Sequence, residues 1–305
     1  MPFTLRQLEY FVAVAEAGSL TAAARACHVS QPSVSVAITD LEAVLGQNLF
    51  QRQAGQSLSI TPAGRRLLIQ ARTVLATAED ISGGSHNEVT RIAIACFRDI
   101  GPMYLPRVLT ALTENDLMVV VGLSEGDLVD VRTQVLDGRC DIAITYNIGL
   151  EGHGIVVDPI DSLAPYVMLP AGHRLADRTE IELADLAGER LVLEDFPVTR
   201  DYFLDMFRRG GIEPGQVQNV PSFELQRGLV ARSWGIGLSC VRPKSDASYD
   251  GSALVCLTLA DPEPQQTICL AHLGLRTLSP SVRKFRDIAM RLGPPTETST
   301  TRTDG

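Results

Sequence analysis

Four residues at the start of an apolar-patterned stretch could contact nucleic acid. They are Gln31, Pro32, Ser33 and Ser35. A glutamine amide can form two hydrogen bonds with an adenine edge, and a serine hydroxyl can bond to either base or phosphate. The N-terminal end of a helix is the part that a helix-turn-helix protein inserts into the major groove. The pattern predicts DNA contact, although alanine-rich helices alone could also form a protein-docking module.

A second group of candidates stands at the ends of apolar runs after residue 90. Ligands of parallel α/β sheets bind beyond the carboxyl ends of the strands. An arginine there can hold a carboxylate, and a helix that begins there offers free N–H groups. The small-molecule contacts expected on this rule are Phe97, Arg98, Ser124, Thr145, Tyr146, Arg200, Ser222 and Phe223. A carboxylate-bearing ligand is expected, because Arg200 is predicted to open a helix beyond a strand end.

The two arginines have structural alternatives that the sequence leaves open. Arg200 could pair with Asp201 or Asp205, and Arg98 could pair with Asp99 at the surface. Each arginine would then be unavailable to a ligand.

The uncharged candidates have alternatives as well. Thr145 and Ser222 could cap turns, and Phe97 and Tyr146 could be core aromatics. Glu125, at another strand end, would repel an anion or bind an amine. The mixture does not identify the ligand.

No catalytic or metal-binding constellation is expected from the sequence. It contains no HExxH or Walker loop, and its five histidines have no metal-ligand spacing. Six cysteines include no CxxC pair, and most stand in apolar runs, which favours buried, inert thiols over disulfides or redox chemistry. We expect no enzyme activity, no cofactor and no metal.

The first 60 residues are expected to form three helices and a small β-wing. Gly18 ends the first helix, Ser19 caps the second, and Ser30 caps a third that ends at Gly46. Residues 49–52 and 58–60, around Gly55, would form the wing. A long helix starts at 61–62, where a threonine cap precedes a proline, and 82–85 (SGGS) predicts a flexible hinge.

Strands and helices are expected to alternate from residue 91 onward. The expected strands or extended segments are 91–96, 117–123, 140–146, 155–169, 191–194, 236–241, 253–259 and 266–273. The expected helices are 101–113, 128–136, 200–209, 223–233 and 281–292. The βαβαβ order at the start implies a parallel sheet with right-handed crossovers.

Composition and charge limit the class of protein. The chain has 305 residues, 45% of them apolar, and a net charge of −9. Residues 1–66 hold five arginines against four acids, so the acidic excess lies in the remainder. This distribution fits a small DNA-binding module on an acidic body. No apolar run reaches about 18 residues and no signal peptide begins the chain, so a cytoplasmic protein without a membrane anchor is expected.

Several segments resemble, in register, the winged helix-turn-helix of the LysR-type transcriptional regulators. They are 15–21 (AEAGSLT), 29–33 (VSQPS), 41–42 (LE), 45–46 (LG), 49–50 (LF) and 61–64 (TPAG). The body is similar to the periplasmic-binding-protein-like effector domain of that family. The resemblance implies promoter DNA as partner, a dimer through the long helix, usually built into tetramers, and a small-molecule effector in a cleft. The DNA contacts expected by position are Ser19, Thr21, Ser30, Gln31, Pro32, Ser33, Ser35 and, at the wing, Arg52.

The domain organisation expected from these patterns has five parts. They are a winged helix-turn-helix at 1–60, a linker helix at 61–82, a hinge at 83–90, an effector domain at 91–293 and a disordered tail at 294–305. The effector domain would comprise subdomain I (about 91–161 and 268–293) and subdomain II (about 162–267). The alternative function is a cytoplasmic solute-binding or enzyme-like protein whose N-terminal helices only dimerise it.

The sequence departs from the family pattern at the DNA-binding end. Many members carry a basic residue at the position of Val36 and another near Asp40. Gln51, Gln53 and Gln56 stand where family wings are often basic. We expect weaker non-specific DNA affinity than is usual, with DNA binding retained.

The cysteines also depart from one branch of the family. That branch senses peroxide through a closely spaced cysteine pair in the second subdomain. Here Cys240 has no near partner, since the next cysteine is Cys256, and Cys96 closes the first expected strand. Redox sensing is therefore not expected.

Overall fold

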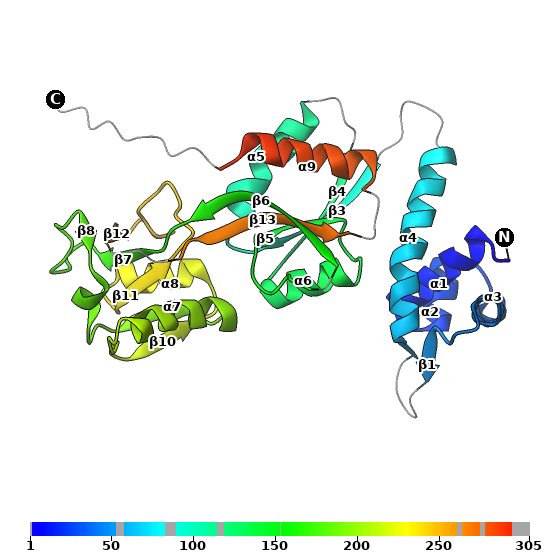
Figure 1. Cartoon of the computed structure of the whole chain (residues 1–305), viewed down its shortest axis with the longest axis horizontal. Helices are drawn as coiled ribbons and strands as arrows, with labels where there is room; N and C mark the ends of the chain where they lie inside the picture. The colour runs from blue at the N-terminus through cyan, green and yellow to red at the C-terminus, as the bar shows by residue number, and fades with distance from the viewer. Residues whose placement is uncertain are drawn as a thin grey trace.

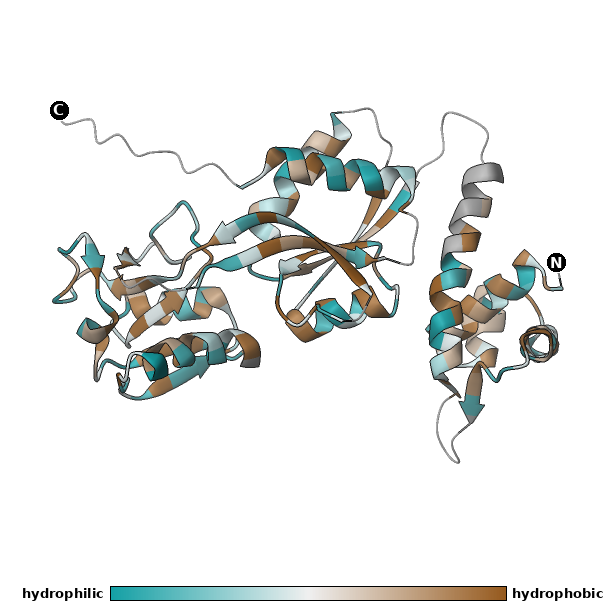
Figure 2. Cartoon of the chain, in the orientation of Figure 1, coloured by the Kyte–Doolittle hydropathy of each residue, from teal (hydrophilic) through white to brown (hydrophobic). Residues whose placement is uncertain are grey.

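The computed structural model describes residues 2–52, 58–82, 90–114, 119–152, 154–260, 264–274 and 278–294. A helical N-terminal domain, one long helix and two α/β lobes follow one another along the longest axis of the molecule (Figure 1). Strands in the middle of each lobe are predominantly apolar, whereas the helices expose hydrophilic faces (Figure 2). No helix among the described residues has both the length and the apolar composition that a membrane span requires.

The N-terminal domain has the predicted winged helix-turn-helix arrangement. Its elements are α1 (Leu5–Ala17), α2 (Leu20–Ala26), α3 (Gln31–Leu45), β1 (Phe50–Arg52) and β2 (Leu58–Ile60). The hydroxyls of Ser19 and Ser30 accept the N–H groups of Ala22 and Ser33, which confirms both predicted caps. Gly18 and Gly46 end their helices in the left-handed conformation, at φ 60° and 64°.

The wing is braced by the end of α3 and the start of α4 (Pro62–Ser82). One carboxylate oxygen of Glu42 accepts the backbone N–H groups of Leu49 at 2.6 Å and Phe50 at 3.1 Å. The Thr61 hydroxyl accepts the N–H of Gly64 at 3.0 Å, so the predicted threonine cap is confirmed. A Cβ on Gly64 would lie 2.3 Å from the Leu49 carbonyl oxygen, and therefore only glycine fits there.

Lobe I is built on a five-stranded mixed sheet in the order β4-β3-β5-β13-β6. Its strands are β3 (Thr90–Phe97), β4 (Val119–Gly126), β5 (Ile142–Tyr146), β6 (Ile155–Leu163) and β13 (Gln266–Leu273). β3 runs parallel to β4 and β5, as the βαβαβ pattern predicts. Helices α5 (Gly101–Thr113) and α9 (Pro280–Leu292) share one core with the sheet, and α6 (Leu128–Leu136) shares the core on the other face.

Lobe II is built on a six-stranded sheet in the order β10-β9-β11-β7-β12-β8. Its strands are β7 (Tyr166–Pro170), β8 (Glu180–Ile181), β9 (Leu191–Glu194), β10 (Val217–Val220), β11 (Ile236–Ser239) and β12 (Leu254–Leu259). The turn η1 (Leu183–Leu186) and the helices α7 (Pro197–Arg209) and α8 (Phe223–Ala231) complete it. The chain enters lobe II between β6 and β7 and returns between β12 and β13 (Figure 1). The predicted limits of the two subdomains remain predictions.

Some predicted elements differ from the structure. α7 begins at Pro197, three residues before Arg200, because proline at the first helical position needs no N–H partner. Arg200 therefore does not open a helix. The short strands β8 and β10 form by pairing with neighbours and leave little local signal. Gly55, the segment 83–89 of the predicted hinge and the predicted tail beyond residue 294 lie outside the described residues.

Arg72 on α4 connects the N-terminal domain with lobe I. Its guanidinium donates to Glu16 of α1 at 2.8 Å and to the backbone oxygens of Asp137 and Gly138 at 3.2 and 2.5 Å. Ile69, one turn earlier on α4, packs against the core under α6. The linker helix thus contacts both the domain before it and the lobe after it.

The terminal helix α9 is tied to the sheet of lobe I by a two-point ion pair. The Nε and a terminal nitrogen of Arg286 lie 2.5 and 2.7 Å from the two carboxylate oxygens of Asp158 on β6. These hydrogen bonds hold the pKa of Asp158 below its usual range. His272 Nε2 lies 3.8 Å from the same carboxylate.

Replacement of Arg286 should loosen α9. Arg286→Ala should lower the free energy of unfolding by about 1–2 kcal/mol at pH 7, because it leaves a largely buried carboxylate without its donor. Since the folded pKa of Asp158 is lowered, this contribution is present above about pH 4 and is lost as the pH falls below that. Urea unfolding at pH 7 and pH 3 measures it, with the exposed Arg283→Ala as control. Equal losses in the two variants would contradict the role of Arg286.

Candidate functional site

The start of α3 presents the residues that were predicted to contact DNA. Gln31, Pro32 and Ser33 are exposed, and Ser35 is half-buried. Ser30 is exposed, but its hydroxyl bonds to the N–H and, at 2.7 Å, to the hydroxyl of Ser33. The cap thus orders the first turn, and Gln31 remains the largest polar side chain at this end of the helix.

The surroundings of α3 hold the remaining predicted DNA contacts. Thr21 on α2 is exposed and Ser19 is half-buried. The backbone of Arg52 lies in β1, but its side chain lies outside the described part of the chain, as do Gln53 and Gln56. Val36 is 59% exposed, so the expected basic position of the family is here an apolar surface residue.

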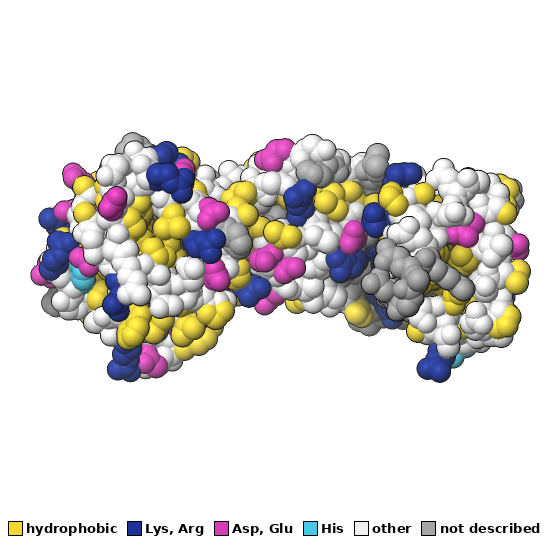
Figure 3. Space-filling view, turned by 90° about the horizontal axis from the view of Figure 1, so that it is seen from below, with side chains coloured by type: hydrophobic (Ala, Val, Ile, Leu, Met, Phe, Trp, Pro, Cys, Tyr) yellow, Lys and Arg dark blue, Asp and Glu magenta, His cyan; other side chains and the backbone are white. Residues whose placement is uncertain are grey.

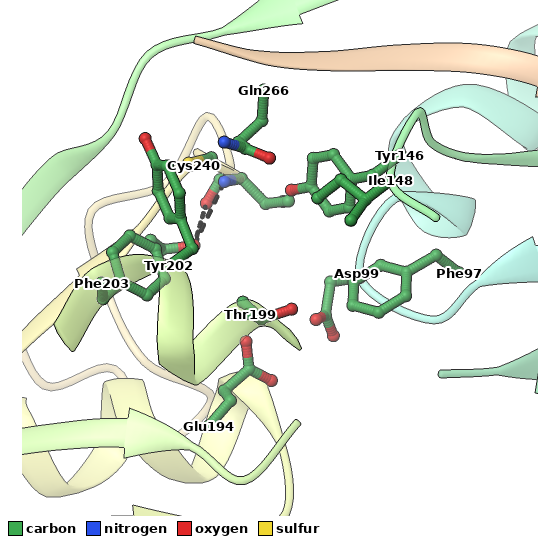
Figure 4. Close-up of a pocket in the computed structure, with 12 residues that line it drawn as sticks. Phe97, Asp99, Tyr146, Ile148, Glu194, Thr199, Tyr202, Phe203, Cys240 and Gln266 are labelled. Carbon is green, nitrogen blue, oxygen red and sulfur yellow. Dashed lines mark hydrogen bonds between the residues drawn. The ribbon is translucent and has the colours of Figure 1, made fainter. Parts of the chain in front are cut away.

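A small cavity lies between the two lobes (Figure 4). Its volume is about 20 Å³, which is room for one water molecule. Lobe I and the strand returning to it contribute Phe97, Asp99, Tyr146, Ile148 and Gln266. Lobe II contributes Glu194, Thr199, Tyr202, Phe203, Ser239, Cys240 and Val241. The cavity is therefore an inter-lobe site rather than a pocket of either sheet.

Two carboxyl groups face each other across this cavity. Burial raises the pKa of Asp99, which follows β3, and raises the pKa of Glu194, the last residue of β9, further above its usual range. The negative charge of Asp99 adds to the rise in the pKa of Glu194, so the pair favours a form in which Glu194 carries a proton. The positive charge of Arg98 opposes the shift at both carboxyls.

Aromatic rings surround the carboxyl pair. The ring of Phe97 lies 5.4 Å from that of Tyr146 and 5.9 Å from that of Phe196, both edge-on. The Arg98 guanidinium stacks 4.7 Å above Phe196. On the other side, the Tyr202 hydroxyl donates to the Pro264 carbonyl at 2.6 Å. The cavity therefore combines acidic groups with aromatic walls.

Two of the eight predicted effector contacts, Phe97 and Tyr146, line the cavity. Arg200 instead pairs with Asp195 at 2.7 Å and with Asp201 at 3.5 Å. The pairing with Asp201 is one of the two structural alternatives that the sequence left open. Arg98 lies against Phe196 rather than in the cavity wall. As effector contacts, Arg200 and Arg98 stay predictions.

The other four predicted contacts are engaged elsewhere in the two lobes. Ser124 donates to the Gln134 side chain at 2.6 Å. Ser222 caps α8, and Phe223 beside it packs between the cores of both lobes. Thr145 is buried in β5, opposite Cys269 of β13. Their roles in binding also remain untested predictions.

Sequence reasoning missed most of the cavity wall. In this part of lobe II the strand-end rule selected Arg200 and passed over Glu194, the last residue of β9. The same rule, applied to β11, would have found Ser239 and Cys240. Tyr202 and Phe203 carry no such signal, because they lie inside α7 and reach the cavity only through the packing of that helix.

The cysteines of the structure are all free thiols, and five of the six are buried. Cys240 lines the cavity, where burial raises its pKa to about 12, and burial raises the pKa of Cys96 to about 11. Because the thiolate is the reactive form, neither environment favours reaction with an oxidant. Among the described residues, no three potential ligands cluster in a way that could hold a metal.

The fold and the site together define a class of protein. A winged helix-turn-helix joined by one long helix to a two-lobed α/β domain is the architecture of a DNA-binding regulator with a ligand-binding domain. Residues 5–65 match the bacterial regulatory helix-turn-helix protein, lysR family, and residues 85–293 match the LysR substrate binding domain. The chain belongs to the LysR family of DNA-binding transcriptional regulators.

Relatives match the chain over nearly its whole length. The hydrogen peroxide-inducible genes activator of Pectobacterium carotovorum subsp. carotovorum is 31% identical over 299 residues, which cover 93% of this chain and 94% of that protein. HinK, a LysR family regulator from Pseudomonas aeruginosa, is 31% identical with a TM-score of 0.62, covering 95% and 98%. A full-length OxyR variant from Pseudomonas aeruginosa shares the fold, with a TM-score of 0.76 at 24% identity, covering 97% and 100%.

The carboxyl pair should leave a signature in the pH dependence of stability. Because the folded pKa of Glu194 is raised, its protonated form stabilises the fold at low pH, and that stability is lost as the pH rises toward the folded pKa. Glu194→Gln is neutral at every pH. Its stability relative to the wild type should therefore rise by about 1–3 kcal/mol between pH 5 and pH 8.

Urea unfolding at the two pH values measures this difference. Glu213→Gln, which removes an exposed carboxyl in lobe II, is the matched control and should show a much smaller change. Identical pH dependence in Glu194→Gln and wild type would show that Glu194 is ionised in the folded protein.

Proposed function

We propose that this chain is a non-enzymatic transcriptional regulator that places α3 in the major groove of promoter DNA. A small molecule that enters the inter-lobe cavity would change its affinity for that DNA. The observation that carries the proposal is a cavity lined by both lobes, in the same chain as an exposed helix-turn-helix. A ligand that contacts both lobes can shift their relative position by its differential affinity for the two arrangements.

The DNA contacts that we propose are those expected from the sequence. Gln31 and Ser33 would meet base edges, whereas Ser19, Thr21, Ser30, Pro32 and Ser35 would position the two helices, with Arg52 at the wing. The exposed polar end of α3 and the caps that order it support this assignment.

The assembly that we propose is a dimer through α4, built further into a tetramer. Val74 on α4 is 44% exposed, an apolar side chain that a partner helix would cover. Two recognition helices related by a two-fold axis would meet two half-sites of a palindromic operator.

A carboxylate on the effector is the ligand class expected from Arg200. That arginine is paired with two aspartates and does not line the cavity, so the expectation depends on its release from them. A carboxylate therefore stays the second candidate for the chemistry of the ligand.

A gel shift with promoter DNA from beside its own gene tests the regulatory function. Specific retention, competed by the same sequence and not by random DNA, is the expected result. The alternative, a solute-binding or enzyme-like protein whose N-terminal helices only dimerise it, predicts no specific retention.

The recognition helix can be tested through Gln31. Gln31→Ala should weaken binding to the operator by about 1–3 kcal/mol, because it removes a potential bidentate contact with a base. Gln47→Ala, an exposed glutamine just beyond the other end of α3, is the matched control. Unchanged operator affinity in folded Gln31→Ala would remove α3 from the major groove.

The uncharged surface of α3 allows a gain of function. Val36→Arg should strengthen binding to operator and random DNA alike, and should steepen the slope of log affinity against log salt by about 0.9. Val44→Arg, at an exposed position near the far end of α3, controls for the added charge. An equal gain from both variants would show that Val36 does not lie close to a phosphate.

A further inference from the structure

We propose that the effector is a small organic cation whose protonated nitrogen binds between Asp99 and Glu194, with its apolar part against the aromatic walls of the inter-lobe cavity. The inference rests on the proposed function and names the chemistry of its ligand. It is carried by the positions of two carboxyls, an unpaired buried oxygen and the rings around them.

The carboxyl groups come from different lobes and meet in the same cavity. Asp99 follows β3 in lobe I, and Glu194 ends β9 in lobe II. Figure 4 shows both side chains directed toward the space between the lobes, with Thr199 beside them. A cation bound there would attract both lobes at once and would favour the arrangement in which they stay close.

The Oε1 atom of Glu194 is an acceptor without a donor. The residue is only 7% exposed, and this oxygen has no hydrogen-bond partner within the described part of the chain. A buried acceptor that remains unpaired is costly, and such atoms are rare in folded proteins. An ammonium group has several N–H donors and could pair with Glu194 and Asp99 together.

The charges that face the pair favour a cation over an anion. Glu125 adds a third carboxylate near Asp99, and Arg98 is the one cation that acts on both members of the pair among the described residues. The remaining titratable neighbours, Tyr104, Tyr146 and Cys240, are neutral groups whose pKa values burial raises. A ligand carboxylate would lie beside like charge, whereas a protonated nitrogen would neutralise it.

The aromatic residues suit the rest of such a ligand. Phe97, Tyr146, Tyr202 and Phe203 line the cavity, and the faces of such rings attract organic cations. The present volume of about 20 Å³ accepts a group of the size of an ammonium head. A larger molecule would enter as the two lobes separate.

Binding of a cation should be linked to proton release. Without ligand, the pair shares a proton, because burial and mutual repulsion raise the pKa of Glu194. With a cation between them both carboxyls are ionised, so about one proton leaves on binding near pH 7.5 and affinity rises with pH there. A ligand that binds elsewhere would not show this linkage.

Calorimetry on the full chain can test the proposal with defined probes. Ethylammonium and 2-phenylethylammonium are compared with the alcohol and the carboxylate of the same skeleton, in two buffers of different ionisation enthalpy. We expect the amines to bind, the alcohols and carboxylates to bind at least about tenfold more weakly, and proton release to appear only with amines.

Variants test whether the amines bind at the carboxyl pair. Glu194→Gln and Asp99→Asn should each weaken amine binding about tenfold or more and should abolish proton release, whereas Asp201→Asn, an exposed carboxyl on α7, should change neither. Arg200→Ala distinguishes the second candidate, since only a carboxylate ligand would depend on it. The number of protons released when an amine binds is measured on the wild-type chain, so this test remains valid if a variant fails to fold.

The outcomes separate this inference from the proposed function. Three results would each overturn the inference. The first is that carboxylates or alcohols bind as well as the amines, and the second is that amines bind without proton release. The third is that no amine binds to a protein that still binds its operator DNA specifically. Loss of specific operator binding by the wild-type chain would instead overturn the proposed function, whatever the amines do.

Discussion

Asp99 of lobe I and Glu194 of lobe II meet at one point between two lobes that have separate sheets. Burial of a carboxylate is costly, and two of them at one point are tolerated only if a proton or another cation lies between them. The relative position of the lobes is therefore coupled to whatever occupies that point. The chain itself also connects the lobes, because it passes from lobe I to lobe II after β6 and returns after β12.

The position of lobe I can in turn affect the DNA-binding domain. Arg72 bonds to Glu16 in α1 and to backbone oxygens that follow α6, so one side chain contacts both domains. Ile69 adds an apolar contact on the same side of α4. Both contacts are made by α4, the linker helix that we propose as the dimer contact. A shift of lobe I would alter the spacing of two recognition helices without any change inside them.

The surface charge is consistent with a regulator that relies on specific contacts. On the face shown in Figure 3, lysine and arginine side chains are scattered among acidic ones, without a continuous basic stripe. The exposed valine on α3 and the net charge of −9 lower the electrostatic attraction to any phosphate backbone. Base contacts from the start of α3 would then account for a larger share of the binding energy.

Local features of the sequence were sufficient to predict the N-terminal domain and most elements of the lobes. A serine or threonine cap, a proline in the first turn and a glycine at the helix end act within a few residues, so Ser30, Thr61 and Gly46 have the predicted roles. The composition of the cavity was decided by tertiary structure. Glu194 meets Asp99 only because the two lobes pack against each other at the cavity, whereas Arg200 pairs with Asp195 because α7 starts at Pro197. The meeting of Glu194 with Asp99 joins segments that are about 95 residues apart in the sequence, which no local pattern encodes.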